Sequence, residues 1–233
     1  MPSEQKSLAE LQKLASSIDN HERYLHPHAS KLAELAEALA RRTGLGGADL
    51  DAIKLAALLH DIGELALDGE LISQPVKFNL STKINIQTHS ILGEQQIAKH
   101  GISKQVQLLV RWHHEWWNGT GYPDCLCGEE IPLGARILRL VDTYDALSSL
   151  RPYREAFSKP EVRHIIAAFA GIEFDPQLVK IFLSMLEEEE SYPIIDTTKD
   201  ESFATAASQE LTEEALDGNS SKKDDEKPQL DSI

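Results

Sequence analysis

The sequence predicts an all-α fold, a single compact bundle of helices. Apolar residues recur at helical spacing through most of residues 8–186. No segment shows sustained alternation of apolar and polar residues, the period-2 pattern that predicts a half-buried strand. Glycines and capping residues mark the ends of the periodic segments. The chain of 233 residues therefore has room for one helical domain of moderate size plus tails.

The helices are predicted one after another along this domain. Residues 8–18 carry the first, and residues 28–46 carry the second, in which leucines recur at helical spacing before a stop signal at Gly44. Residues 65–87 are the irregular part and are expected to loop over one side. Further helices are predicted at 49–63, 88–101, 103–116, 132–150, 159–171 and 175–190.

The chain divides into three parts. Residues 1–20 are expected to form an N-terminal helix, and residues 21–186 the helical domain. Residues 187–233 form an acidic tail that we expect to be disordered, because it is rich in Ser, Thr, Asp, Glu and Lys and has few aromatic residues. The N-terminal helix and the tail are the candidates for regulation, for contact with a signalling partner, or for homodimer formation.

The charge of the chain is unevenly distributed. Of the formal net charge of −15, the tail carries most, with 15 Asp and Glu against 4 Lys, so the rest of the chain carries only about −4. This distribution allows an anionic substrate but argues against binding to a nucleic-acid polymer, which needs a basic face. No apolar run approaches the roughly 20 residues of a membrane span, and no secretory signal is visible. We therefore expect a cytoplasmic protein that does not bind a membrane.

Several histidines and one aspartate follow the apolar spacing of their predicted helices. His28, His60 and His113 each lie three, four or seven residues from an apolar residue on the same helical face. Asp142 also falls on an apolar face, where a carboxylate is costly unless it is paired or bound to metal. Asp145, three residues further on, either shares that face or is solvated.

This pattern favours a metal site over a set of ordinary core residues. A single histidine on an apolar face is most often a hydrogen-bonded core residue. The adjacent pairs His60-Asp61 and His113-His114, on successive helices, weaken that interpretation, because burying them together without a cation leaves many polar groups unpaired. Imidazoles with carboxylates suit Fe, Mn, Zn, Ni or Co, and the set is too rich in nitrogen for Ca²⁺.

Three segments together resemble the HD-GYP domain, a branch of the HD phosphohydrolase superfamily. They are HDIGE at 60–64, HSILGEQQI at 89–97, and the run at 113–158 that begins HHEWWNGTGYP and ends RPYREAFS. The resemblance extends from about Tyr24 to Leu183, and its third segment is the most specific. It implies a helical bundle of the HD type and a hydrolase for cyclic di-GMP, a bacterial second messenger of signal transduction.

The resemblance also implies a set of metal ligands. A first metal would be held by His28, His60, Asp61 and Asp142, and a second by His89, His113 and His114, with Asp61 bridging the two. Two divalent transition-metal ions, such as Fe or Mn, would acidify a bridging water, and the metal-bridging hydroxide would attack the phosphodiester in line. Tyr24 stands where some members carry a glutamate for a third metal, so we expect a two-metal site.

Four residues are predicted to bind the substrate. The resemblance implies this role for Tyr122, Arg151 and Arg154, and Asp145 is a further candidate. The Gly-Tyr-Pro loop either holds Tyr122 near a ligand or caps a helix. The two arginines would clamp phosphates, and the alternative for them is a surface salt bridge or a helix cap.

Glu64 departs from the family pattern, which has a lysine here that reaches the substrate phosphate. An anion in its place would repel phosphate. Glu64 ligates a metal, pairs with an arginine or weakens catalysis, and with Asp61 it is a catalytic candidate. The substitution keeps two alternatives open. One is a catalytically weak module that binds metal or nucleotide and signals through a partner, and the other is an HD phosphohydrolase that acts on another nucleotide.

Overall fold

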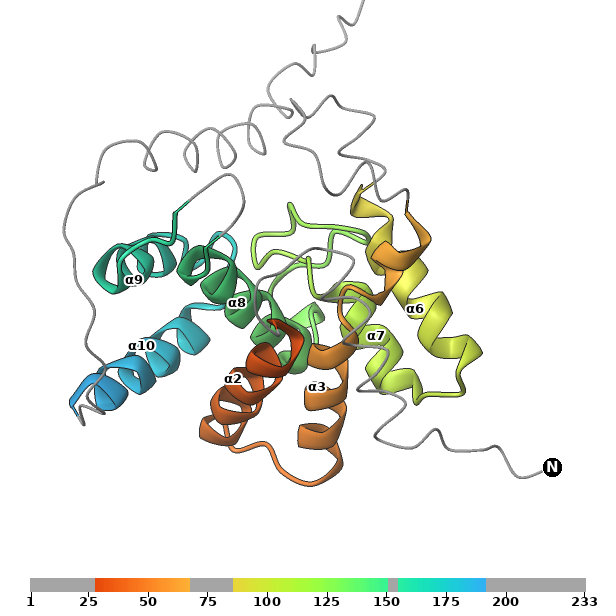
Figure 1. The fold of residues 1–233 in the computed structure, drawn as a ribbon, viewed down its shortest axis with the longest axis horizontal. Coiled ribbons are helices and arrows are strands. Elements are labelled where there is room, and N and C mark those ends of the chain that lie inside the picture. Colours follow the sequence, from red (N-terminus) through yellow and green to blue (C-terminus); the bar gives the residue numbers. More distant parts are fainter. Residues whose placement is uncertain (1–27, 68–85, 151–154, 192–233) are drawn as a thin grey trace, which may run out of the picture. The chain divides into compact units, whose positions relative to one another are not determined.

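The computed structural model describes residues 28–67, 86–150 and 155–191, which form a bundle of helices (Figure 1). The elements are α2 (His28–Arg42), α3 (Ala48–Leu59), η1 (Ile62–Ala66), α6 (His89–Lys99), α7 (Lys104–Trp112), η2 (Gly128–Glu130), α8 (Leu133–Ser148), α9 (Lys159–Ala168) and α10 (Pro176–Ser191), of which η1 and η2 are short 3-10 helices. Strand pairing in these residues is limited to two isolated bridges, so the predicted all-α class is confirmed.

Helices α2 and α3 pack as an antiparallel pair, and α8 lies against both (Figure 1). Both helices of the pair bury alanines, whose small side chains allow close packing at little cost in side-chain entropy. Because the two helices run in opposite directions, the start of α2 lies beside the end of α3. This arrangement brings His28 close to His60, with ring centroids 5.4 Å apart.

Helices α6 and α7 form a second pair, which packs against η1 and α3 (Figure 1). Gly63 permits the close approach of η1 to α6, since a Cβ atom at this position would lie 1.9 Å from the carbonyl oxygen of His89. A Cβ atom at Gly93 would lie 2.9 Å from the side chain of Val110 in α7. The start of α6 is therefore fixed beside the turn that leads from α3 into η1.

Helix α8 lies at the centre of the bundle and contacts α2, α3, α7, α9 and α10. Its apolar side chains Ile137, Leu138, Leu140 and Val141 are at most 1% exposed. Helix α9 begins with a capping box, in which the backbone N–H of Ser158 donates to Glu161 over 2.8 Å. Because α8 is packed on several sides, burying a polar side chain on it costs free energy unless other polar groups contact that side chain.

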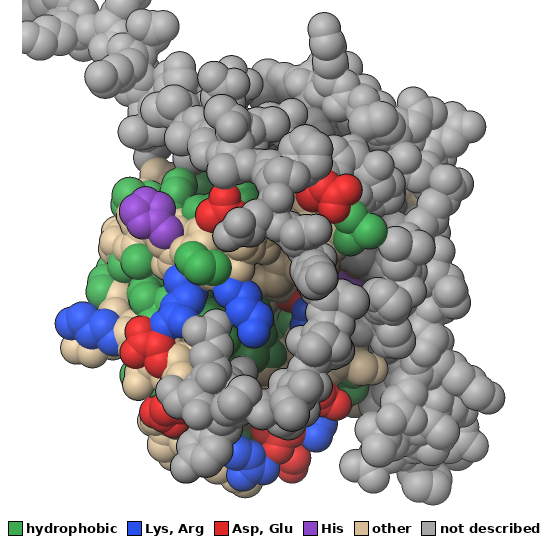
Figure 2. Space-filling model, turned by 60° about the vertical axis from the view of Figure 1, so that its left-hand side comes forward, with side chains coloured by type: hydrophobic (Ala, Val, Ile, Leu, Met, Phe, Trp, Pro, Cys, Tyr) green, Lys and Arg blue, Asp and Glu red, His purple; other side chains and the backbone are tan. Residues whose placement is uncertain are grey.

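Ion pairs connect α10 to its neighbours at the surface. Arg42 of α2 lies 2.8 Å from Glu188, and Arg163 of α9 lies 2.6 Å from Glu187. On the face drawn in Figure 2, acidic and basic side chains of the described residues are interspersed and form no broad basic surface. No helix in the described part of the chain has the length and apolar character needed to cross a membrane.

Several boundaries differ from the sequence-based predictions. Helices α2 and α9 end at Arg42 and Ala168, four and three residues before their predicted ends. The segment predicted as one helix at 49–63 is divided, because α3 ends at Leu59 and η1 follows. Helix α7 ends at Trp112, four residues before the predicted end, so His113 and His114 lie at and beyond its C-terminus. Helix α10 continues to Ser191, past the expected start of the tail. The predicted helix at 8–18, most of the irregular segment and the tail from residue 192 lie outside the described residues.

Candidate metal centre

The first group of ligand-type side chains consists of His28, His60 and Asp142. They come from the start of α2, the residue after α3 and the middle of α8. Oδ1 of Asp142 lies 4.0 Å from Nε2 of His28 and 3.9 Å from Nε2 of His60. Both histidines are buried, and the side chain of Asp142 is 15% exposed. Three helices thus bring one donor atom each to a common point.

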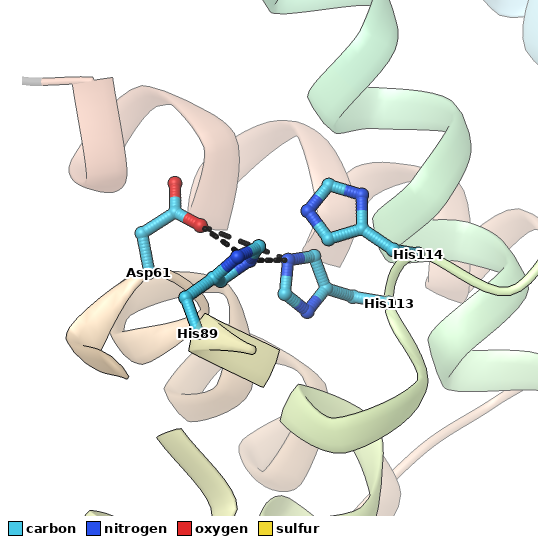
Figure 3. Close-up of side chains that lie close together, drawn as sticks. All are labelled: Asp61, His89, His113 and His114. Atoms are coloured by element: carbon cyan, nitrogen blue, oxygen red, sulfur yellow. Dashed lines mark hydrogen bonds and ion pairs between the residues drawn. The ribbon is translucent and has the colours of Figure 1, made fainter. Parts of the chain in front are cut away.

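The second group consists of Asp61, His89, His113 and His114, which Figure 3 shows converging from different segments. Asp61 lies in the turn between α3 and η1, His89 begins α6, and the two adjacent histidines follow α7. Oδ1 of Asp61 lies 3.4 Å from Nε2 of His89 and 3.7 Å from Nε2 of His113. The two Nε2 atoms are 3.4 Å apart.

Asp61 connects the two groups through its two carboxylate oxygens. Oδ2 lies 2.8 Å from Nε2 of His60 in the first group. Oδ1 faces His89 and His113 in the second group. The structure therefore places Asp61 between the groups, where one carboxylate can serve two cations.

Four of the five histidines have a hydrogen-bond acceptor behind the ring. Nδ1 of His60, His89 and His113 lies 2.9, 2.7 and 2.6 Å from the backbone carbonyl oxygen three residues earlier in the chain. Nδ1 of His28 lies 2.6 Å from Oδ2 of Asp145. Because these oxygens only accept, each ring donates its Nδ1–H and directs Nε2 to the ligand group, as in metal-binding histidines generally.

Burial and charge shift the ionisation of these residues in opposite directions. Burial lowers the pKa of His89 to about 4. Burial also opposes a charge on His60, but the carboxylates of Asp61 and Asp142 outweigh it and raise the pKa of His60 to about 10. Burial disfavours the anionic form of Asp61 as well, yet His60 and the other histidines hold the pKa of Asp61 well below its ordinary value. Asp61 is therefore an anion at neutral pH.

The donor atoms of both groups fit divalent metal ions. The Nε2 atoms of His89 and His113 face each other over 3.4 Å, and Nδ1 of each ring is already engaged by a carbonyl oxygen behind it, so both Nε2 atoms are placed to bind one cation. A mixture of imidazole and carboxylate donors suits transition metals. His28, His60 and Asp142 would hold one ion, and Asp61, His89, His113 and His114 the other.

His114 has different surroundings from the other four histidines. Its Nδ1 lies 2.8 Å from Nη1 of Arg139, and a guanidinium group only donates hydrogen bonds. Tyr122 stacks on the ring of His114, with centroids 4.8 Å apart and an angle of 23° between the planes. Arg139 also lies 2.5 Å from Oε1 of Glu173 and 3.8 Å from Oδ2 of Asp142.

Glu115 fixes the loop that carries Tyr122. This glutamate is buried, and its two oxygens accept hydrogen bonds from the backbone N–H groups of Asp124, over 2.6 Å, and Leu126, over 3.1 Å. Gly121 allows the loop to lie close to the chain before it, since a Cβ atom there would be 2.2 Å from the backbone nitrogen of Trp116. The loop thereby holds Tyr122 against His114.

Of the remaining predicted site residues, those that the structure describes belong to neither ligand group. Asp145, a predicted substrate-binding residue, is 2% exposed, and its carboxylate contacts His28 behind the ring. Glu64 is half-buried in η1 and belongs to neither group. Burial raises the pKa of Tyr122 above its ordinary value, and the negative charge of Glu64 adds to the rise. Arg151 and Arg154 lie outside the described residues.

Arg139 and Glu173 are not among the site residues predicted from the sequence. Arg139 lies three residues before Asp142, so the helical period of α8 places both on one face, and this spacing could have identified it. Glu173 is 8% exposed and lies between α9 and α10. Because Glu173 lies outside any helix, helical spacing could not predict its contact with Arg139, which the structure shows.

The family is identified by comparison with family models. The family model described as "HD domain" matches residues 12–178, so the chain belongs to the HD-domain family. The matched range includes every residue of the two ligand groups. The resemblance to HD-GYP proteins, predicted from the sequence motifs, is confirmed.

Two relatives and one solved structure illustrate the family. The chain is 30% identical over 177 residues to 3′3′-cGAMP-specific phosphodiesterase 2 of Vibrio cholerae, a match that covers 75% of this chain and 34% of that protein. It is 34% identical over 197 residues to a cyclic di-GMP phosphodiesterase of the same organism, with 78% and 39% covered. The structure of the V. cholerae cyclic GMP-AMP-specific phosphodiesterase V-cGAP3 shares the fold, with a TM-score of 0.62 at 20% identity over 78% of this chain and 49% of that one. The chain spans less than half the length of each protein.

Proposed function

We propose that the protein is a metal-dependent phosphodiesterase that hydrolyses cyclic di-GMP. The observation that carries this proposal is the pair of ligand groups that share Asp61. A site that holds two metal ions side by side is a recurring solution for the hydrolysis of phosphodiesters. The two V. cholerae relatives named as phosphodiesterases of cyclic dinucleotides support the substrate class.

The chain's residues orient the site for this reaction. When bound, two divalent ions would activate water and neutralise the charge of the phosphate. The low pKa of Asp61 keeps its carboxylate ionised between the two groups. The Nδ1 hydrogen bonds of His60, His89 and His113 hold the three rings with Nε2 directed inward.

The substrate would bind beside Tyr122. Its ring is stacked on His114, which places it at the edge of the second group. We assign the phosphate contacts to Arg151 and Arg154, whose guanidinium groups suit bidentate binding of phosphate oxygens. These contacts would orient one phosphodiester toward the ions.

Hydrolysis of purified substrates tests the proposal. With Mn²⁺ or Fe²⁺ and without oxygen, we expect cyclic di-GMP to yield the linear dinucleotide or GMP. The same assay with 3′3′-cGAMP decides between the two substrate types, because the relatives differ in this respect. Asp61→Asn should lower kcat by more than about 100-fold, since the shared carboxylate is lost. Glu129→Gln, at an exposed position in η2, is the matched control. Metal-loaded protein that hydrolyses neither substrate would contradict the proposal.

A second candidate is a binding module that signals through a protein partner. Glu64 favours it, because an anion that acts electrostatically on Tyr122 also repels phosphate. Glu64→Lys separates the two candidates. A gain of hydrolysis would identify Glu64 as a barrier to catalysis, whereas a loss would identify it as part of a working site. Tight binding of cyclic di-GMP without turnover would favour the module.

A further inference from the structure

We propose that Arg139 controls the second metal site by competing for His114, so that this site binds its ion more weakly than the first. The inference rests on the metal-dependent function proposed above. Among the described residues, Arg139 is a basic side chain that contacts a member of each ligand group, His114 and Asp142. We assign the role to Arg139 for this reason.

The hydrogen bond between Arg139 and His114 has only one direction. Nη1 of Arg139 lies 2.8 Å from Nδ1 of His114, and guanidinium carries donors alone. Nδ1 must therefore accept, which leaves the hydrogen of the neutral ring on Nε2. Figure 3 shows one ring nitrogen of His114 on the side of the other labelled residues and one directed away from them. The nitrogen that faces the group thus carries a hydrogen in place of a lone pair.

The other histidines show the opposite arrangement. His28, His60, His89 and His113 each donate Nδ1–H to an oxygen behind the ring. That contact is the usual partner of a metal-binding histidine, since it directs the lone pair of Nε2 to the metal. In the described part of the chain, His114 is the one histidine of the five that has a cationic side chain, that of Arg139, beside Nδ1. While this contact is made, His114 presents no lone pair to the metal site.

Glu173 holds Arg139 in this position. Nη2 of Arg139 lies 2.5 Å from Oε1 of Glu173, and the same oxygen accepts a hydrogen bond from Thr143 over 3.1 Å. The side chains of Arg139 and Glu173 are 15% and 8% exposed. Moving the guanidinium away would strand a buried carboxylate, which is costly. Its positive charge also repels a metal ion directly.

The two sites should therefore fill at different metal concentrations. The histidines of the first group are backed by acceptors, so both rings direct Nε2 toward the ion, and no cationic side chain of the described residues competes for their Nδ1 atoms. The second group keeps Asp61, His89 and His113 as ready ligands and gains His114 only when Arg139 leaves it. The first ion then binds at concentrations at which the second site is still empty.

Equilibrium dialysis with Mn²⁺, followed by metal analysis, measures both affinities. The test variant is Arg139→Met combined with Glu173→Gln, so that no carboxylate is stranded, and Glu173→Gln alone is its reference. We expect the second Mn²⁺ to bind about 10- to 100-fold more tightly after the loss of Arg139, the size of effect that groups behind metal ligands exert. The first affinity should change less, because Arg139 lies 3.8 Å from Oδ2 of Asp142 but contacts neither Nδ1 atom of the two histidines in that group. Arg139→Gln with Glu173→Gln is a second variant with the same expected direction. Arg163→Met is the control, because it removes an equal charge from α9, a helix that contributes no residue to either group.

Adding His114→Ala to both proteins completes the test. Where Arg139 is present, loss of His114 should leave the second affinity nearly unchanged, because His114 is not acting as a ligand. In the Arg139→Met background, the same change should abolish the gain. Loss of the second Mn²⁺ on His114→Ala while Arg139 is present would overturn the proposal, as would the absence of any gain in Arg139→Met. No nucleotide is needed, so failure to hydrolyse cyclic di-GMP is a separate result that leaves these outcomes readable.

Discussion

Asp145 shows how one buried carboxylate can orient a ligand-type histidine. Burial disfavours its anionic form, but hydrogen bonds from His28 and Lys31 outweigh this effect and lower the pKa of Asp145 to about 2. The ionised carboxylate accepts from Nδ1 of His28 over 2.6 Å. The ring of His28 is thereby held at the position from which it faces Asp142. We therefore propose that Asp145 positions His28 and does not itself contact the ion.

Asp145→Asn should weaken metal binding at the first group. The amide is uncharged and accepts a weaker hydrogen bond, so the orientation and basicity of His28 are reduced. We expect the first Mn²⁺ to bind about 10- to 100-fold more weakly in equilibrium dialysis. Ser149→Ala removes a hydroxyl 3.3 Å from the same carboxylate and is the control. An unchanged metal affinity with a raised KM for cyclic di-GMP would instead support the substrate-binding role predicted from the sequence.

The identities of the ligand-type residues could be predicted from the sequence, but their partners could not. Adjacent pairs such as His60-Asp61 indicate a metal site because burying them otherwise leaves polar groups unpaired. The contact of Arg139 with Glu173 joins residues 34 positions apart, one of them outside any helix. Such a contact depends on how helices pack, which spacing within one helix does not encode.

At the scale of elements, the helices were predictable and several of their ends were not. Two of these ends, those of α3 and α7, coincide with ligand-type histidines. The ring of His60 donates to the carbonyl oxygen of Ala57, and that of His113 to the carbonyl oxygen of Val110. In a continuing α-helix, each of these oxygens would accept from the backbone N–H four residues later. The side chain takes over that bond, so apolar periodicity alone predicts helices that run too far.

The loop between α7 and η2 depends on Glu115. Glu115→Ala removes the acceptor of two backbone N–H groups, those of Asp124 and Leu126. A stranded donor costs about 1–3 kcal/mol, so we expect the free energy of unfolding to fall by about 2 kcal/mol in chemical denaturation. Amide hydrogen exchange should accelerate in residues 119–127. Glu129→Ala, an exposed glutamate nearby, should change neither quantity. Unchanged exchange in the loop would show that other contacts hold it.

The approach of η1 to α6 depends on Gly63. In Gly63→Ala the new methyl group would meet the carbonyl oxygen of His89 at 1.9 Å, so α6 must shift. Overpacking of this kind costs about 1–3 kcal/mol, and the shift carries His89 away from Asp61. We expect a lower Tm and loss of the second Mn²⁺, with the first retained. Gly46→Ala, where nothing lies within 4 Å of the added atom, is the matched control. Retention of both ions would show that the backbone adapts without moving His89.

At the scale of the whole molecule, the two ligand groups join segments far apart in the sequence. The first connects α2, α3 and α8, and the second connects the turn before η1 with α6 and the end of α7. Asp61 links the groups, so metal binding would cross-link most of the central bundle. A cation bound only by the folded chain stabilises that chain by mass action.

Removal of metal should therefore destabilise the folded protein as a whole. An ion present at about 1,000 times its Kd contributes about 4 kcal/mol, and in a domain of this size each kcal/mol shifts Tm by about 2–4 °C. We expect chelation with EDTA to lower Tm by about 10 °C in calorimetry, and added Mn²⁺ to restore it. A variant that carries both His60→Ala and His113→Ala, one ligand from each group, should have the same Tm with and without EDTA. If the unaltered chain behaved like that variant, the two groups would be polar clusters of the core without a bound ion.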